Sequence, residues 1–130
     1  MSFNKVVPHE AEAYIEAVID GHEDWQSALQ VIEEMTDAAA ELDFDRILLD
    51  FSTVDMRVAV SETPDIARIF DSFSPGPMQL GIIPSPDPKG RATVEAFASH
   101  IGALGHTVTI VSNDAERASW IAGQGISRAV

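Results

Sequence analysis

Apolar residues recur along the chain at two spacings, and the change from one spacing to the other predicts where strands give way to helices. Residues 6–7 and 13–19 have strand character. A turn at 8–12 separates them and a stop at 20–21 ends the second, so we expect an N-terminal β-hairpin. From 24 to 42, apolar side chains return every three or four residues instead. That spacing predicts the longest helix of the chain.

The next segment, residues 47–51, is a continuous apolar run interrupted by one aspartate. This pattern is typical of a strand that is covered on both faces and is therefore parallel to a neighbour. The order of apolar strand, polar turn and amphipathic helix then repeats towards the C-terminus. The remaining predicted elements are a helix from Thr63-Pro64 to the stop at 74–77, a strand at 78–83, a helix from near Gly90 to Gly105, a strand at 107–111, and a helix between Asn113 and Gly123.

Strands that alternate with helices after an initial hairpin predict an α/β layer fold. We expect a mostly parallel sheet of about five strands with four helices. The length of 130 residues fits one domain, over 1–130, with a single core.

The charge of the chain limits its partners. Aspartate and glutamate number 21 against 8 lysines and arginines, which gives a formal net charge of −13. This charge disfavours a nucleic-acid backbone or an anionic bilayer, so we expect no nucleic-acid partner. No apolar run approaches the roughly 20 residues of a membrane span, and the N-terminus lacks a signal-peptide pattern. We therefore expect a cytoplasmic protein without a membrane span.

Few residues of the chain carry chemistry at a recognisable spacing. The absence of cysteine excludes disulfides, Cys-ligated zinc and thiol nucleophiles. No serine lies in a nucleophile elbow, and no glycine-rich phosphate loop occurs. No two histidines stand four residues apart, the spacing that places two imidazoles on one helical face; they are His9, His22, His100 and His106. We expect no cofactor, no metal site, no catalytic residue and no enzymatic activity.

Asp50 is the residue that comes nearest to an active-site position. It lies at the C-terminal end of a predicted strand, where open α/β sheets place their ligand sites, and Asp55 follows five residues later. A magnesium site or a phospho-accepting aspartate would use this place, but the lysine that a receiver domain carries after its last strand is missing after Val111. We interpret Asp50 as an acceptor of backbone N–H groups in a turn and Asp55 as solvated. A small enzyme or metal protein that uses both carboxylates is one functional alternative, and it ranks below the two hypotheses that follow.

Several stretches, in this order and spacing, resemble a STAS or SpoIIAA-like domain over nearly the whole chain, and in particular the small stand-alone bacterial members described as STAS/SEC14-like. They are Ile47-Leu48-Leu49-Asp50-Phe51, Leu80-Gly81-Ile82-Ile83, Ala96-Phe97-Ala98, Gly105-His106-Thr107-Val108-Thr109-Ile110-Val111, and Asp114-Ala115-Glu116-Arg117-Ala118-Ser119-Trp120-Ile121. The resemblance implies a SpoIIAA-like sandwich without catalytic apparatus. Such a domain is used for protein contact, often in regulation, or for binding an apolar or nucleotide ligand.

The segment 52–63 is where the chain departs from that family. In the anti-sigma-factor antagonists of the superfamily, this loop carries an Asp-Ser doublet whose serine is phosphorylated. No such doublet occurs here, and the nearest hydroxyl is Ser61, so we do not carry the phosphoswitch over. The segment carries apolar residues instead, at Met56, Val58 and Val60. If these are exposed, they dock a partner or form half of a symmetric dimer.

Our leading hypothesis is therefore a non-enzymatic regulatory or protein-interaction domain whose partner is another protein or a second copy of the chain. The residues expected to contact a partner or ligand are Asp50, Ser52, Thr53, Asp55, Met56, Arg57, Val58 and Ser61. The alternative is a module that binds a small apolar ligand or lipid in a pocket between helices and sheet. The residues expected to line that pocket are Phe70, Phe73, Phe97 and Met78.

Overall fold

The computed structural model describes residues 4–123, which form one mixed sheet with helices on both faces. The five strands lie in the order β1-β2-β3-β4-β5. Strand β1 is antiparallel to β2, and all other neighbours are parallel. The strands are β1 (Lys5–His9), β2 (Tyr14–Glu23), β3 (Arg46–Met56), β4 (Gln79–Ile83) and β5 (Thr107–Ile110). The predicted hairpin and mostly parallel sheet are confirmed.

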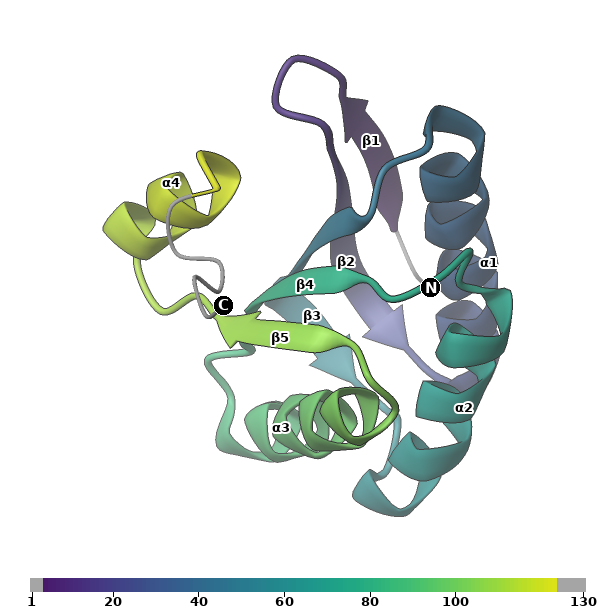
Figure 1. Cartoon of the computed structure of the whole chain (residues 1–130). Helices are drawn as coiled ribbons and strands as arrows, with labels where there is room; N and C mark the ends of the chain where they lie inside the picture. Colours follow the sequence, from purple (N-terminus) through teal and green to yellow (C-terminus); the bar gives the residue numbers. More distant parts are fainter. Residues whose placement is uncertain (1–3, 124–130) are drawn as a thin grey trace.

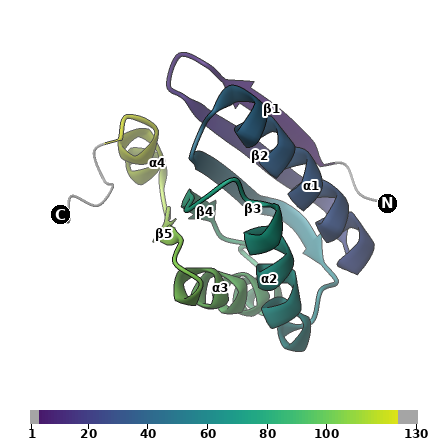
Figure 2. The ribbon, with the colours of Figure 1, turned by 45° about the vertical axis from the view of Figure 1, so that its right-hand side comes forward.

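Three helices cover one face of the sheet and a fourth lies on the other (Figure 1). They are α1 (Trp25–Leu42), α2 (Thr63–Phe73), α3 (Pro88–Ala103) and α4 (Asp114–Ile121), with a short 3₁₀ turn, η1 (Val60–Glu62), before α2. Figure 2 shows α1, α2 and α3 along the same side, with α4 apart from them. The four predicted helices are confirmed.

The main core lies between the three helices and the sheet. In β2 every second residue points towards these helices, so Ile15, Ala17 and Ile19 are almost fully buried. A smaller cluster on the opposite face joins α4 to the sheet; it consists of Tyr14, Leu48, Val111 and Trp120. Helix α4 therefore covers only one part of that face.

Local sequence explains why α1 begins where it does. Asp24 is the N-cap: its side chain accepts a hydrogen bond from the Ser27 backbone N–H, and its own N–H donates to Ser27 Oγ. This reciprocal arrangement gives hydrogen-bond acceptors to two backbone N–H groups, those of Asp24 and Ser27, at the start of the helix. Helix α3 is capped similarly, because the Asp87 side chain accepts from the Gly90 N–H at 3.0 Å.

Two strands run further than the sequence predicts. The expected stop at 20–21 is wrong, because β2 continues to Glu23, and the first part of the expected loop at 52–63 is strand, because β3 continues to Met56. The extensions pair with each other after a register shift between Val18 and Asp20. Each extension supplies the hydrogen-bond partners that the other needs, so the local turn signal at 20–21 is overridden.

Two smaller expectations also need correction. Pro8, predicted in the turn, belongs to β1, which is possible because β1 is an edge strand whose outer N–H groups need no partner. Phe73, predicted on the inward face of its helix, is 47% exposed: Phe70 is the last residue of α2 that is buried in the core, and Phe73 ends the helix. Among residues 4–123, no helix is long and apolar enough to cross a membrane.

Candidate functional site

A cavity of ≈ 50 Å³ lies between the sheet and helices α1, α2 and α3; it is lined by side chains of the main core and is partly open to the surface. It is close to the carboxyl ends of β2 and β3, the end at which parallel α/β sheets place their ligand sites. Its walls are almost entirely apolar. The lining residues are Ile19, Glu23, Ala28, Val31, Ile32, Met35, Leu49, Phe51, Met56, Val58, Thr63, Ile66, Thr93, Val94 and Phe97.

Glu23 is the one ionisable residue in that wall. It is 4% exposed, and its Oε1 accepts hydrogen bonds from Ser27 Oγ at 2.8 Å and from Asn4 Nδ2 at 3.2 Å. Burial raises the pKa of the Glu23 carboxyl above its ordinary value, and the two hydrogen bonds oppose that shift. The cavity therefore has a carboxyl group at its edge that is held in place by side chains of α1 and of the residue before β1.

The two threonines of the cavity wall are already satisfied. Thr93 Oγ1 donates to the Val58 carbonyl at 3.0 Å, and Thr63 Oγ1 donates to the Val60 carbonyl at 2.7 Å. Both bonds hold the segment between β3 and α2 against the helices. A ligand in the cavity would therefore meet an apolar surface rather than free hydroxyl groups.

The segment 56–61, between the end of β3 and the start of α2, forms one wall of the cavity. Met56 and Val58 face inward and line the cavity, whereas Arg57, Val60 and Ser61 are exposed. The first turn of α3 packs tightly against this wall, because a Cβ added at Gly90 would lie 3.3 Å from the Met56 Cβ. The segment thus has one face towards the cavity and one face towards solvent.

The outer face of this wall carries a charged cluster at the ends of β2 and β3. Arg57 contacts Asp55 through Nη2 at 2.7 Å and through Nε at 3.0 Å, and His22 Nε2 lies 3.2 Å from the same carboxylate. The hydrogen bond from Arg57 holds the pKa of Asp55 below its ordinary value. This cluster orients exposed side chains on the outer surface of the wall.

Asp50, the residue that the sequence placed nearest to an active-site position, lies on the opposite face of the sheet from the cavity. Its Oδ1 accepts hydrogen bonds from the Ser52 N–H at 2.9 Å and from Ser52 Oγ at 2.6 Å. The expected bond to a backbone N–H is present, although it lies within β3 and not in a turn. Ser52 and Thr53 are exposed.

The extension of β3 separates the two aspartates that a metal site would need. Five residues of extended strand place the Cα atoms of Asp50 and Asp55 about 16 Å apart. A single ion cannot bridge carboxylates at that separation. Nor do the described residues 4–123 contain a group of three or more potential metal-ligating side chains. Asp50 and Asp55 therefore do not lie together as ligands of one ion would.

Val58 needs a correction of its role. We expected it on an exposed apolar patch with Met56 and Val60, but Val58 is 7% exposed and belongs to the main core. Only Val60, at 50% exposed, is available to a partner protein. The reason is that Met56 and Val58 share the inward face of the extended segment, whereas Val60 begins the 3₁₀ turn η1, where the alternation of a strand no longer holds.

The predicted apolar pocket between helices and sheet exists, but most of its predicted lining is wrong. Phe97 lines the cavity, whereas Phe70 and Met78 are buried elsewhere in the core and Phe73 is exposed. Sequence reasoning missed Glu23 because it ended the second strand at residues 20–21 and began the helix at residue 24. The period of two in β2, continued from Ile19, would have placed Glu23 on the buried face.

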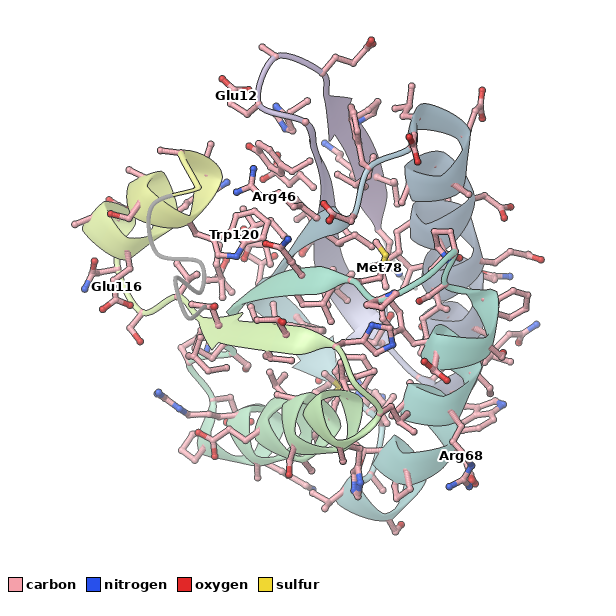
Figure 3. The ribbon with its side chains drawn as sticks, in the orientation of Figure 1. Glu12, Arg46, Arg68, Met78, Glu116 and Trp120 are labelled. Carbon is pink, nitrogen blue, oxygen red and sulfur yellow. The ribbon has the colours of Figure 1, made fainter. Side chains whose placement is uncertain are left out.

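On the other face of the sheet, arginine side chains attach α4. Arg46 lies with its guanidinium 4.4 Å from the Trp120 ring centroid and donates hydrogen bonds to the carbonyl groups of Glu12, Trp120 and Ile121 (Figure 3). Arg117 of α4 pairs with Glu16 of β2 at 2.8 Å. These contacts use polar groups of this face to hold α4 on the sheet.

Comparison with known proteins shows the fold alone. No family model and no curated protein matches the sequence. A solved structure of an uncharacterised protein of the DUF3478 family with a SpoIIAA-like fold, from Shewanella loihica PV-4, superimposes with a TM-score of 0.58 and 10% identity, over 92% of this chain and 93% of that one.

The unphosphorylated form of the anti-sigma factor antagonist SpoIIAA matches with a TM-score of 0.56 and 13% identity, over 95% of this chain and 97% of that one. The phosphorylated form of the Bacillus cell fate determinant SpoIIAA gives 0.53 and 13%, over 92% and 99%. The protein therefore has a SpoIIAA-like fold, as the sequence resemblance implied. Function has to be argued from the site.

Proposed function

We propose that this protein is a non-enzymatic binding protein that takes a small apolar ligand, or the apolar end of a larger one, into the cavity between its three helices and its sheet. The observation that carries the proposal is the cavity itself, which is lined by side chains of α1, α2, α3, β2 and β3. Protein cores are normally packed without such space. Its position beside the carboxyl ends of parallel strands, where α/β sheets place their ligand sites, supports a binding role.

The size and polarity of the cavity limit the ligand. Apolar cavities of about 150 Å³ bind benzene or xenon. The present cavity of ≈ 50 Å³ is smaller, so it takes xenon or a short alkyl group without rearrangement. A longer chain would require α1 and α2 to move apart. Because the threonine hydroxyls of the wall are used by backbone carbonyls, selection is by shape and apolar contact.

A protein-interaction or regulatory role is a second candidate, and the exposed side of the cavity wall favours it. Val60 presents an apolar side chain that is 50% exposed, next to exposed Arg57 and Ser61. Because Met56 and Val58 of the same segment contact the cavity, a ligand that shifts them would also shift this outer surface. Replacement of Val60 by serine should then weaken self-association or partner binding with little loss of stability, as measured by sedimentation and urea unfolding.

The ligand proposal is tested with xenon as the probe, by following methyl chemical shifts of Ile32, Met35 and Val94 as the xenon pressure rises. We expect saturable shifts in the native protein. The variant Ala28→Leu fills the cavity from α1 and should remove them, because Ala28 lines the cavity and is 6% exposed. The control Ala40→Leu, exposed on the same helix, should leave the shifts unchanged.

The effect of filling the cavity can also be measured as a change in the free energy of unfolding. Ala28→Leu is expected to leave the free energy of unfolding unchanged or to raise it by up to about 1 kcal/mol, because added apolar atoms occupy empty space. Should Ala28→Leu prove strained, Val94→Ile adds a single methylene to the same cavity. Xenon shifts that persist in both filled variants, or that are missing in the native protein, would contradict the proposal.

A further inference from the structure

The two edges of the sheet differ in how well they are protected. On β1, Pro8 has no N–H to offer and Lys5 places a charged side chain on the edge, two devices that prevent another strand from pairing. On β5 the edge reads Thr107-Val108-Thr109-Ile110, with no charge, no proline and no bulge. Within residues 4–123 no strand pairs with the outer side of β5 (Figure 1).

The backbone of β5 presents its free groups at defined positions. The N–H groups of Thr107 and Val111 donate to the Met78 and Ile82 carbonyls of the β4 side, at 3.0 and 2.8 Å. Because backbone groups alternate along a strand, Val108 and Ile110 direct their N–H and C=O groups outward. These groups form the hydrogen-bonding edge that an additional extended strand needs.

A hollow of ≈ 230 Å³ opens beside this edge, between β5 and α4. It is lined by Thr109, Ile110, Ala115, Glu116, Ser119 and Trp120. Ile110 is 39% exposed. A strand added to β5 would place every second side chain on the α4 side, above this hollow, which is large enough for one aliphatic side chain.

The charge of the surroundings decides which occupant fits. Glu116 lies on the rim of the hollow, Asp114 precedes it at the start of α4, and both are exposed. A second copy of this chain would bring another formal charge of −13 to the same edge. Like charge disfavours that pairing, whereas a basic segment is attracted.

We propose that the outer edge of β5 is a docking site for an extended, basic segment of another protein. The segment adds a strand next to β5, bonds to the backbone of Val108 and Ile110, inserts an aliphatic side chain beside α4 and places a lysine or arginine near Glu116. This interaction lies on the opposite edge of the sheet from β1 and outside the ligand cavity, so it goes beyond the proposed function.

The test uses a short fluorescein-labelled peptide that alternates lysine with valine, and measures its affinity by fluorescence anisotropy. The native protein should bind it, and its Val108 and Ile110 amide signals should shift while that of Val111, bonded to the β4 side, should not. The same peptide with glutamate in place of lysine should bind at least about tenfold more weakly.

Two matched variants separate docking at this edge from general attraction to an acidic protein. Ile110→Lys and Val7→Lys add the same charge at positions of similar exposure, 39% and 41%, on opposite edges. Ile110→Lys should weaken binding at least about tenfold, and Val7→Lys should not. Ile110→Pro removes the outward N–H without adding a charge and should act like Ile110→Lys, with folding checked by circular dichroism.

Equal effects of Ile110→Lys and Val7→Lys would overturn the proposal, since they would show attraction by net charge only. Absence of binding at about 1 mM peptide would overturn it as well. A dimer in sedimentation without peptide, with the Val108 and Ile110 amides protected from exchange, would assign the edge to a second copy instead. Loss of the xenon response in the cavity would leave this proposal untouched, so the two failures are distinguishable.

Discussion

At the scale of single residues, Glu23 shows how burial and hydrogen bonding compete at one carboxyl group. Burial raises its pKa, while the hydrogen bonds from Ser27 and Asn4 stabilise the charged form and act in the opposite direction. The net pKa is raised, so the folded state holds this proton more tightly than the unfolded state does. The stability that this group contributes is therefore present below the unfolded pKa and is lost as pH rises through the folded pKa.

The variant Glu23→Gln tests that balance. Glutamine keeps a carbonyl oxygen for the Ser27 and Asn4 donors but has no charge to bury. We expect its free energy of unfolding to improve relative to the native protein as pH rises from about 4 to about 8, measured by urea unfolding at several pH values. Because the cavity is adjacent, the xenon response should persist in this variant.

The exposed Glu33 of α1 supplies a control. Glu33→Gln should change the free energy of unfolding by no more than about 0.5 kcal/mol. If the Glu23→Gln difference stays constant over the pH range, or if it falls as pH rises, the burial of a charge at Glu23 is not the dominant effect.

At the scale of elements, α4 depends on few contacts. It has eight residues, too short to be stable alone, and of these only Trp120 is buried. Trp120 packs directly on Gly81 of β4, where an added Cβ would lie 2.7 Å from its ring. Arg46 of β3 covers the other side of that ring and binds carbonyl groups at the end of the helix.

Removal of Arg46 should therefore detach α4. We expect Arg46→Ala to lower the free energy of unfolding by about 2 kcal/mol, because a desolvated cation–π contact and charge-assisted hydrogen bonds are lost together. Trp120 fluorescence should shift to longer wavelength as the ring becomes solvated, whereas Trp25 is unaffected. Fluorescence and urea unfolding measure the two effects.

Arg91 provides the comparison, since it is exposed on α3 and pairs with Glu95 one turn away. Arg91→Ala should leave the fluorescence unchanged and the stability within about 0.5 kcal/mol of the native value. An Arg46→Ala protein with native fluorescence would show that packing of Trp120 on Gly81 is sufficient to hold α4.

Local sequence predicts some of these elements and not others. The helix at 24–42 was predicted accurately because its apolar period is a local signal. The extensions of β2 to Glu23 and of β3 to Met56 were not, because each requires the other as partner across more than thirty residues of chain. Pairing of this kind has no local signature when it begins after a bulge.

At the scale of the whole molecule, the formal charge of −13 opposes the compact state through repulsion. Salt screens repulsion between exposed charges, with a screening length of about 10 Å at 0.1 M. We expect the melting temperature to rise by a few degrees between about 0.01 M and about 0.3 M sodium chloride, measured by calorimetry.

The double variant Glu33→Lys with Asp37→Lys reverses two exposed charges of α1 and should reduce that salt dependence. A melting temperature that is insensitive to salt, or that falls, would mean that attractive ion pairs such as Arg117–Glu16 outweigh the repulsion. The affinity of the lysine–valine peptide for this double variant, compared with that for the native protein, also separates attraction by net charge from docking on β5.

The sequence by itself determined the fold class, the order of strands and helices and the absence of thiol chemistry, because hydrophobic period, caps and composition are local properties. Only the tertiary structure decided which side chains meet. Val58 was expected outside and lies inside, and Glu23 was overlooked and lies at the cavity, because the cavity is formed by five elements that are distant in sequence. Periodicity states which face of an element is apolar, but packing between elements decides where space remains.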